Sequence, residues 1–298
     1  MIQIVIINSE GKYTNNYYLI DGMTMGLPKF LSIYIVENNG MRLMIDVGEA
    51  LKVRTVIKKL KDFGLYPIHK IVLTHSHWDH AQGLSKMNKS IKDLDVEILA
   101  SEKAIDNLRH PEKMIDGFEG PNTIPFEDEV TPLKEGDIID LNGLELEVMN
   151  FFGHTMDSIG LFDDSNRNIF IGDAVSMRLD QNAFYIPLMP PNFNEKNLVN
   201  SFQKLRDMKS RLDSISIAHF GVWKDNHFEQ ILNEMEDLYF KVKNSLIEWY
   251  DEDPSIDIIT SKYCKTLIPN STFWDEKILE FIVGMMINGL KISGLIEG

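Results

Sequence analysis

The 298-residue sequence predicts an α+β fold with a helical C-terminal extension. Before about residue 225, short runs rich in β-branched residues alternate with amphipathic helical patterns. Beyond that point the apolar residues recur only at helical spacing. With 44% hydrophobic residues, the chain can bury a large core. We therefore expect a principal domain over residues 1–224 and a helical extension over residues 225–298 that packs on it.

Short apolar runs predict strands in the first hundred residues. These runs are Ile2–Ile7, Leu31–Val36, Arg42–Val47, Ile71–Thr74 and Val96–Ala100. The tripeptide Asn38-Asn39-Gly40 separates two of them, and it predicts a hairpin because Asn and Gly tolerate the positive φ angles of a tight turn.

Apolar residues at helical spacing predict several helices. They are Leu51–Phe63, Ser101–Leu108 with Ser101 as its cap, Glu195–Leu212, Asn226–Tyr250 and Trp274–Leu290. Residues 111–136, rich in Pro, Gly and acidic residues, predict a long loop, either a lid or a plain surface excursion. The last helix is apolar on nearly every side from Ile278 onward, so either the parent domain or a second copy in a homodimer must cover it.

The most informative segment is THSHWDH, residues 74–80, which follows a predicted strand. On an extended strand end, His75 and His77 point the same way and can bind one metal ion. If the chain then turns into a helix, Asp79 and His80 face a neighbouring point where a second ion would lie. Imidazole and carboxylate ligands without thiolate suit Zn²⁺, Fe or Mn and favour a catalytic site.

Further residues of the metal-ligating types end other predicted strands. His154 follows the strand pattern that ends at Met149, Asp173 closes an apolar run, and His219 closes another. Singly, each is more typical of a cap or a hydrogen-bonded edge of the core. Together they would lie at one end of a sheet, which favours a metal site.

In the order of these residues the chain resembles the metallo-β-lactamase fold superfamily, over about residues 1–225. The resemblance implies a four-layer αβ/βα sandwich as the catalytic domain. It also implies two metal ions, the first bound by His75, His77 and His154, the second by Asp79, His80 and His219, with Asp173 between them. Asp46 matches an early aspartate that orients ligands in the family.

Two divalent ions can hold a hydroxide between them at neutral pH, because metal binding lowers the pKa of water. A metal-bridging hydroxide would cleave a small thioester or lactone/ester without a protein nucleophile, in keeping with the absence of a Gly-x-Ser-x-Gly motif. Asp79 is the candidate catalytic residue, since it can also pass a proton to the leaving group. We predict a dinuclear metal-dependent hydrolase, with Zn²⁺ as the expected metal and Fe or Mn as alternatives.

The subfamily is less clearly marked. Residues 153–158 are similar to a segment of glyoxalase-II-type thioesterases, but residues 172–176 depart from their pattern and the helical tail lacks a basic cluster for glutathione. Lactone hydrolases of the family often carry Tyr where Ser176 stands, and Tyr185 is the nearest substitute. The alternatives are a phosphodiesterase of the same fold and a mononuclear iron, persulfide dioxygenase-like oxidoreductase, which would use the positions of His75, His154 and Asp173. A non-catalytic scaffold is disfavoured because no ligand is missing.

Net charge and cysteine content bear on the binding partners of the protein and on its cellular compartment. A net charge of −15 argues against nucleic acids and anionic membranes as binding partners, because like charges repel. Cys264 is the single cysteine, which excludes an internal disulfide and fits a reducing compartment. The sequence has no basic leader and no apolar run of membrane-spanning length. We expect a cytoplasmic protein that acts on a small molecule.

Overall fold

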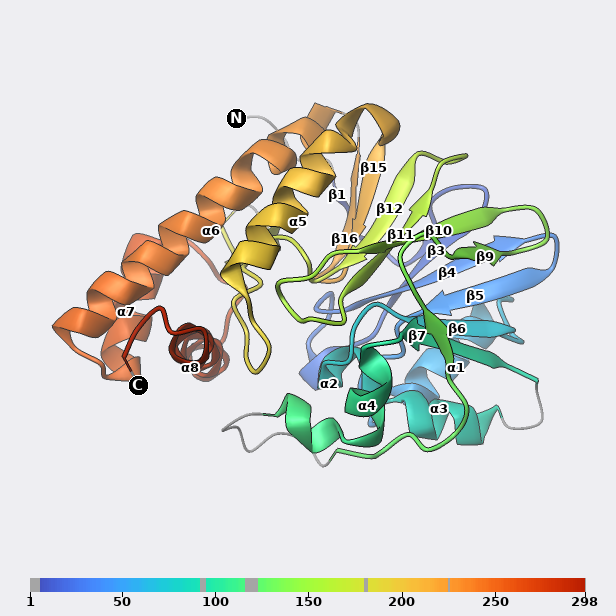
Figure 1. Cartoon of the computed structure of the whole chain (residues 1–298), viewed down its shortest axis with the longest axis horizontal. Helices are drawn as coiled ribbons and strands as arrows, with labels where there is room; N and C mark the ends of the chain where they lie inside the picture. The colour runs from blue at the N-terminus through green and yellow to red at the C-terminus, as the bar shows by residue number, and fades with distance from the viewer. Residues whose placement is uncertain (1–5, 92–94, 116–122, 180–181, 225, 298) are drawn as a thin grey trace.

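Two β-sheets lie face to face, and helices cover both outer surfaces (Figure 1). The computed structural model describes residues 6–91, 95–115, 123–179, 182–224 and 226–297. Between the sheets, buried side chains such as Tyr34, Val72, Leu161 and Phe170 form one apolar cluster. The described residues therefore form the four-layer sandwich that the sequence predicts.

The first sheet comes from the N-terminal part of the chain. Its strands lie in the order β2 (Gly11–Lys12), β3 (Tyr17–Asp21), β4 (Ser32–Asn38), β5 (Met41–Ile45), β6 (Lys70–Leu73), β7 (Glu97–Ser101) and β8 (Thr131–Leu133). From β5 to β8 the neighbouring strands are parallel, so their carboxyl ends share one edge. The predicted hairpin is confirmed, with Asn39 and Gly40 at φ angles of 48° and 83° between β4 and β5.

The second sheet comes mainly from the middle of the chain. Its strands lie in the order β1 (Ile6–Ile7), β16 (Gly221–Lys224), β15 (Ser214–Ile217), β12 (Asn168–Gly172), β11 (Ile159–Asp163), β10 (Glu145–Asn150) and β9 (Ile138–Asp140). β12 and β15 are parallel, and their carboxyl ends therefore also meet at one edge. A separate short hairpin consists of β13 (Met177–Arg178) and β14 (Phe184–Tyr185).

Helices cover the outer face of each sheet with their apolar sides. The first sheet is covered by α1 (Val53–Asp62), α3 (Leu84–Ser90) and α4 (Ala104–Arg109). The second is covered by α5 (Glu195–Asp207) and α6 (Asn226–Glu252). Beyond them, α7 (Ile256–Thr266) packs against α6, and α8 (Glu276–Ile292) packs against α7. The short α2 (Trp78–Ala81) follows β6, and three-residue or four-residue 3₁₀ turns occur at η1 (Thr24–Gly26), η2 (Pro111–Met114) and η3 (Lys209–Arg211).

The C-terminal helices share one apolar cluster with α5 and the second sheet. In α8, Leu279, Val283 and Met286 are buried in that cluster, whereas Phe281 and Met285 are only half-buried. The apolar cluster that α8 shares with α5, α6 and α7 thus covers one side of it. The domain boundary near residue 224 and the homodimer stay predictions. Within the described part of the chain, no helix has the length and apolarity needed to cross a membrane.

Several predicted boundaries were wrong. The helix expected from Ser101 begins at Ala104, and Ser101 does not cap it because this residue instead pairs with Leu133 as the last position of β7. The helix expected to reach Leu212 ends at Asp207, where η3 follows. Helix α7 was not predicted.

Two predicted segments lie partly outside the described residues. Of the predicted strand Ile2–Ile7, the structure describes Ile6 and Ile7, which form β1. The predicted loop over residues 111–136 contains η2 and β8, and residues 116–122 lie outside the described ranges. The prediction of a long loop was therefore wrong near both ends, where η2 and β8 form despite the Pro-rich composition.

Candidate metal centre

The predicted ligands lie together where strands of the two sheets end. His75 follows β6, Asp173 follows β12, and His219 follows β15. His77 stands at the start of α2, which carries Asp79 and His80, and His154 lies in the loop after β10. The structure thus brings all seven predicted ligands to one place.

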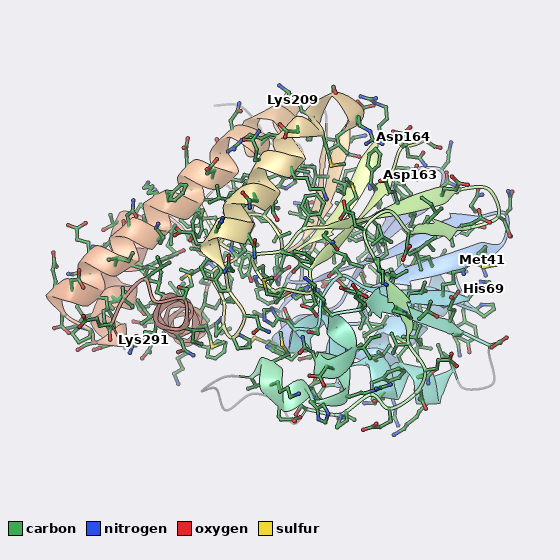
Figure 2. The ribbon with its side chains drawn as sticks, in the orientation of Figure 1. Met41, His69, Asp163, Asp164, Lys209 and Lys291 are labelled. Atoms are coloured by element: carbon green, nitrogen blue, oxygen red, sulfur yellow. The ribbon has the colours of Figure 1, made fainter. Side chains whose placement is uncertain are left out.

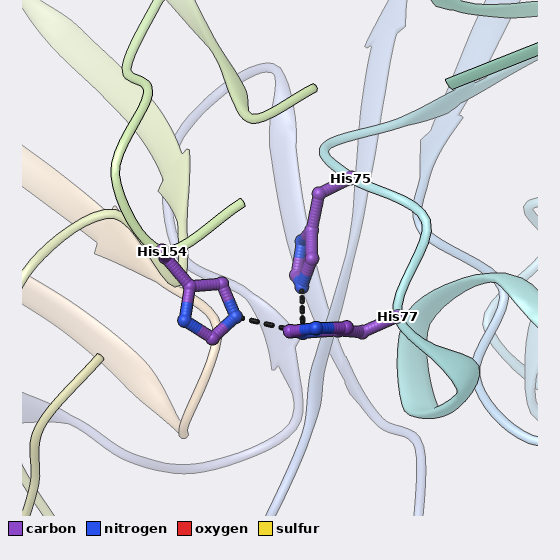
Figure 3. Close-up of side chains that lie close together, drawn as sticks. All are labelled: His75, His77 and His154. Atoms are coloured by element: carbon purple, nitrogen blue, oxygen red, sulfur yellow. Dashed lines mark hydrogen bonds between the residues drawn. The ribbon is translucent and has the colours of Figure 1, made fainter. Parts of the chain in front are cut away.

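Three imidazoles form what we call the imidazole group: His75, His77 and His154. The Nδ1 atom of His77 lies 3.2 Å from Nε2 of His75 and 2.8 Å from Nε2 of His154 (Figure 3). Burial lowers the pKa of all three rings, to about 3 for His154, so they are neutral at physiological pH. The ring nitrogens converge without a charge between them, and this geometry suits a cation.

Asp79, His80 and His219 form a second cluster, the mixed group. The Oδ2 atom of Asp79 lies 3.6 Å from Nε2 of His80 and 3.9 Å from Nε2 of His219. Burial opposes protonation of both rings, but nearby carboxylates outweigh it and raise the pKa of His80 and of His219. The mixed group therefore binds protons more readily than the imidazole group does.

Asp173 lies between the two groups. Its Oδ2 atom is 3.0 Å from Nε2 of His219 and 3.6 Å from Nε2 of His154. Its Oδ1 atom is 3.5 Å from Nε2 of His80, and neither of these two buried atoms makes a hydrogen bond with a residue that the structure describes. Buried polar atoms are rarely left unpaired. The nitrogen and oxygen donors, together with these two orphaned atoms, fit divalent metal ions at this site.

Backbone carbonyls hold the second ring nitrogen of three histidines. The Nε2–H group of His77 donates to the carbonyl of Pro190 over 3.1 Å, and Nδ1–H of His154 donates to that of Pro187 over 3.2 Å. The Nδ1–H group of His219 donates to the carbonyl of Phe30 over 2.6 Å. Because a carbonyl can only accept, each contact fixes the tautomer whose other nitrogen is free to bind a metal.

Side chains hold the remaining two histidines. Asp46 Oδ2 accepts from Nδ1–H of His80 over 2.8 Å and from the hydroxyl of Thr74 over 2.9 Å. Since that hydroxyl donates to Asp46, it accepts from Nδ1–H of His75 over 3.1 Å. Asp46 thus occupies the ligand-orienting position that the resemblance implied, and it supports both groups.

Two glycines permit the close approach of the segments that carry the ligands. At Gly172, φ is +56° and a Cβ would lie 2.8 Å from Oγ1 of Thr74. At Gly153, φ is +135° and a Cβ would lie 2.3 Å from the backbone nitrogen of Leu198. A side chain at either position would push apart the strand ends or the loop that carries His154.

Residues 187–191, the proline segment, were missed as part of the site. The sequence marked them only as the lead-in to a helix, yet their carbonyls hold His77 and His154. The segment also touches α8, where a Cβ added to Gly289 would lie 3.2 Å from the carbonyl oxygen of Leu188. Backbone carbonyls have no sequence signature, so the density of prolines was the one available signal.

A cleft opens onto the ligands. Its polar side is formed by His77, Asp79, Asp173 and His219, and its other lining residues are Met25, Phe30, Trp78, Met114, Tyr185, Met189, Pro190, Phe281, Ile282 and Met285. The Tyr185 ring lies 4.6 Å from the His219 ring, centroid to centroid. Burial, followed by the charges of Asp173 and Asp79, raises the pKa of Tyr185, so its hydroxyl stays protonated and can donate.

The metallo-beta-lactamase superfamily model matches residues 27–219, more than half of the chain. The chain belongs to this superfamily, whose members are mostly metal-dependent hydrolases.

Individual relatives are distant. A hydroxyacylglutathione hydrolase from Serratia proteamaculans is 24% identical over 235 residues, covering 74% of this chain and 80% of that protein. A ribonuclease Z from Clostridium botulinum is 31% identical over 135 residues, covering 42% of this chain and 40% of that protein. The chain spans only 40% to 64% of the length of several curated relatives that it matches.

Among solved structures, a metallo-beta-lactamase family protein from Thermus thermophilus superposes with a TM-score of 0.67 at 17% identity, covering 93% of both chains. At this identity the likeness shows the fold alone.

Proposed function

We propose that this protein is a dinuclear metal-dependent hydrolase that cleaves a small thioester or lactone/ester. The observation that carries the proposal is the way in which hydrogen bonds orient the five clustered histidines. Each has one ring nitrogen held by an oxygen acceptor, and the other nitrogen faces the imidazole group or the mixed group. Asp173 lies within reach of both groups, as a shared ligand would.

The imidazole group would hold one ion, with Zn²⁺ as the expected metal, and the mixed group a second. Bound divalent ions would supply Lewis acidity and lower the pKa of water. The outer contacts of the histidines would keep their metal-binding nitrogens oriented without reorganisation.

Two further side chains would act on the substrate itself. Asp79 lines the cleft and its side chain is 14% exposed, so it can reach a leaving group and pass a proton to it as well as bind metal. Tyr185 would donate a hydrogen bond from its protonated hydroxyl to the substrate's carbonyl oxygen. Tyr185 would then take the role of the tyrosine that lactone hydrolases of the family often carry where Ser176 stands.

The relatives include hydrolases of two substrate classes, thioesters and RNA. Hydroxyacylglutathione hydrolase supports a thioester, and ribonuclease Z supports a phosphodiester. The net charge of −15 disfavours RNA, and none of the described residues that line the cleft is Lys or Arg. We therefore favour the ester and thioester class.

The test combines metal analysis with a substrate panel. The protein is purified in chelator-free buffer, its metal content is measured under metal excess, and it is assayed on thioesters, lactones, phosphodiesters and β-lactams. We expect two ions per chain and hydrolysis of an ester or thioester. His154→Ala should lose metal, whereas His110→Ala, a change at an exposed histidine outside the site, should not. One iron per chain with oxygen consumption on a persulfide would instead support the dioxygenase.

A further inference from the structure

The cleft has an apolar wall that the proposed chemistry does not use. We define this wall as Met25, Trp78, Met114, Phe281, Ile282 and Met285. These residues come from η1, α2, η2 and α8, which are far apart in the sequence but meet at one cleft. Four of the predicted metal ligands line the same cleft, so anything bound against the wall is next to the proposed reactive centre.

Phe281 and Met285 face the cleft and not the core. They are four residues apart and so lie on one side of α8. Both are half-buried and lie outside the apolar cluster that buries Leu279, Val283 and Met286. Met25, which lines the same cleft, leaves 44% of its surface exposed. Apolar side chains kept accessible around a polar site indicate a binding surface.

The cleft offers no positive charge to an anionic substrate. None of its described lining residues is Lys or Arg, and two lysines of the helical tail contact other groups. Lys243 lies 2.5 Å from a carboxylate oxygen of Glu195, and Lys291, labelled in Figure 2, lies 5.1 Å from the ring centroid of Tyr250. The carboxylates of a glutathione thioester would therefore find no partner on these walls.

We infer, building on the proposed hydrolase function, that the substrate is an ester or thioester with an unbranched apolar acyl chain lying against this wall. Its carbonyl would lie beside Asp173 and Tyr185, and its chain would extend toward Met25 and Met285. Methionine side chains adapt to flexible apolar ligands, and this wall carries three of them. Hydrolysis would add water across the acyl carbon–oxygen or carbon–sulfur bond and release an apolar carboxylic acid with an alcohol or thiol.

A series of 4-nitrophenyl esters, from acetate to decanoate, tests the inference on the metal-loaded protein. Each methylene buried against the wall should raise kcat/KM roughly three- to fourfold, until the chain outgrows the cleft. Met285→Glu should abolish this dependence on chain length. The matched control is Ile292→Glu, two turns further along the same side of α8, exposed and outside the cleft, which should keep it. A flat series in the unmodified protein would overturn the inference.

Phe281→Ala is the second variant, in case Met285→Glu does not fold. It should lower kcat/KM on decanoate more than on acetate, since acetate is too short to extend along the wall. Equal losses on acetate and decanoate would contradict a role in chain recognition.

Direct binding separates this inference from the proposed function. Decanoate binding is measured by calorimetry, which needs no turnover. If no ester or thioester is cleaved but decanoate binds and Met285→Glu abolishes binding, the hydrolase proposal fails and the acyl site stands. If esters are cleaved at rates independent of chain length and decanoate does not bind, the hydrolase stands and the acyl site is wrong.

Discussion

The imidazole group and the mixed group lie side by side, yet they differ in charge. Burial keeps His75, His77 and His154 neutral, with lowered pKa values, while the carboxylates around His80 and His219 raise theirs. Protons should therefore compete with a metal ion more strongly at the mixed group than at the imidazole group. Two neighbouring groups that both contain histidines would thus load metal under different conditions.

The two groups also differ in their supports. Carbonyls of the proline segment hold two histidines of the imidazole group. In the mixed group, the carboxylate of Asp46 holds His80 and the carbonyl of Phe30 holds His219. A carboxylate makes its histidine a more basic ligand than a carbonyl does, so substitutions of the supports should affect the groups unequally.

The largest effect should come from Asp173, which the two groups share. Asp173→Ala should lower activity by more than about 10³-fold, beyond the roughly 10²–10³-fold that loss of one oxyanion donor costs. The fold should survive because β12 is held by its own neighbours, and far-UV circular dichroism checks this. Unchanged turnover would refute the bridging role, and loss of structure would make Asp173 mainly structural.

Tyr185→Phe should have the next largest effect. The Tyr185 ring lies closer to His219, at 4.6 Å, than to His154, at 6.4 Å, so its hydroxyl would orient the carbonyl beside the mixed group. Removing that hydroxyl should lower kcat by about 10²-fold with little change in metal content. If metal is lost in parallel with activity, Tyr185 supports the site and does not act on the substrate.

A smaller effect is expected from Asp46→Asn, which weakens the support of His80. We expect metal affinity or activity to fall about 10- to 100-fold, the usual cost of losing an outer ligand contact. Metal titration should show one ion held weakly and one nearly unchanged. Equal weakening of both ions would mean that the link from Asp46 through Thr74 to His75 matters as much as its link to His80.

The mildest perturbation is pH. Raised pKa values mean that His80 and His219 take up protons first as pH falls, and each proton competes with metal. The imidazole group stays unprotonated to lower pH. Between about pH 8 and about pH 6, around the ordinary histidine pKa, stoichiometry should fall from two ions toward one. Simultaneous loss of both ions would show that the groups do not titrate independently.

Much of this site could be predicted because its ligands have distinctive side chains. His75, His77, Asp79 and His80 stand in a compact motif, and His154, Asp173 and His219 each follow an apolar run. Strand ends that share an edge bring such residues together, so the pattern predicts their proximity. Whether they bind metal stays a prediction.

The supports and the wall could not be predicted in the same way. The carbonyls of Phe30, Pro187 and Pro190 act through the backbone, which is the same for every residue type. Phe281 and Met285 belong to a helix that is apolar nearly all round, so periodicity could not separate the side facing the core from the side facing the cleft. The start of the helix near Ser101 was predicted wrongly because a serine can either cap a helix or end a strand, and here it ends β7.

The contact at Gly289 ties α8 to the ligands. Through it, α8 rests on the proline segment, which in turn holds His77 and His154. A metal ion that binds only when His77 and His154 are held in place stabilises the contacts that hold them. These include the contact between the proline segment and α8. Local opening of α8 would therefore become rarer when metal is present, and its amides should exchange more slowly with deuterated solvent. The C-terminal helix and the metal centre would then behave as one cooperative unit.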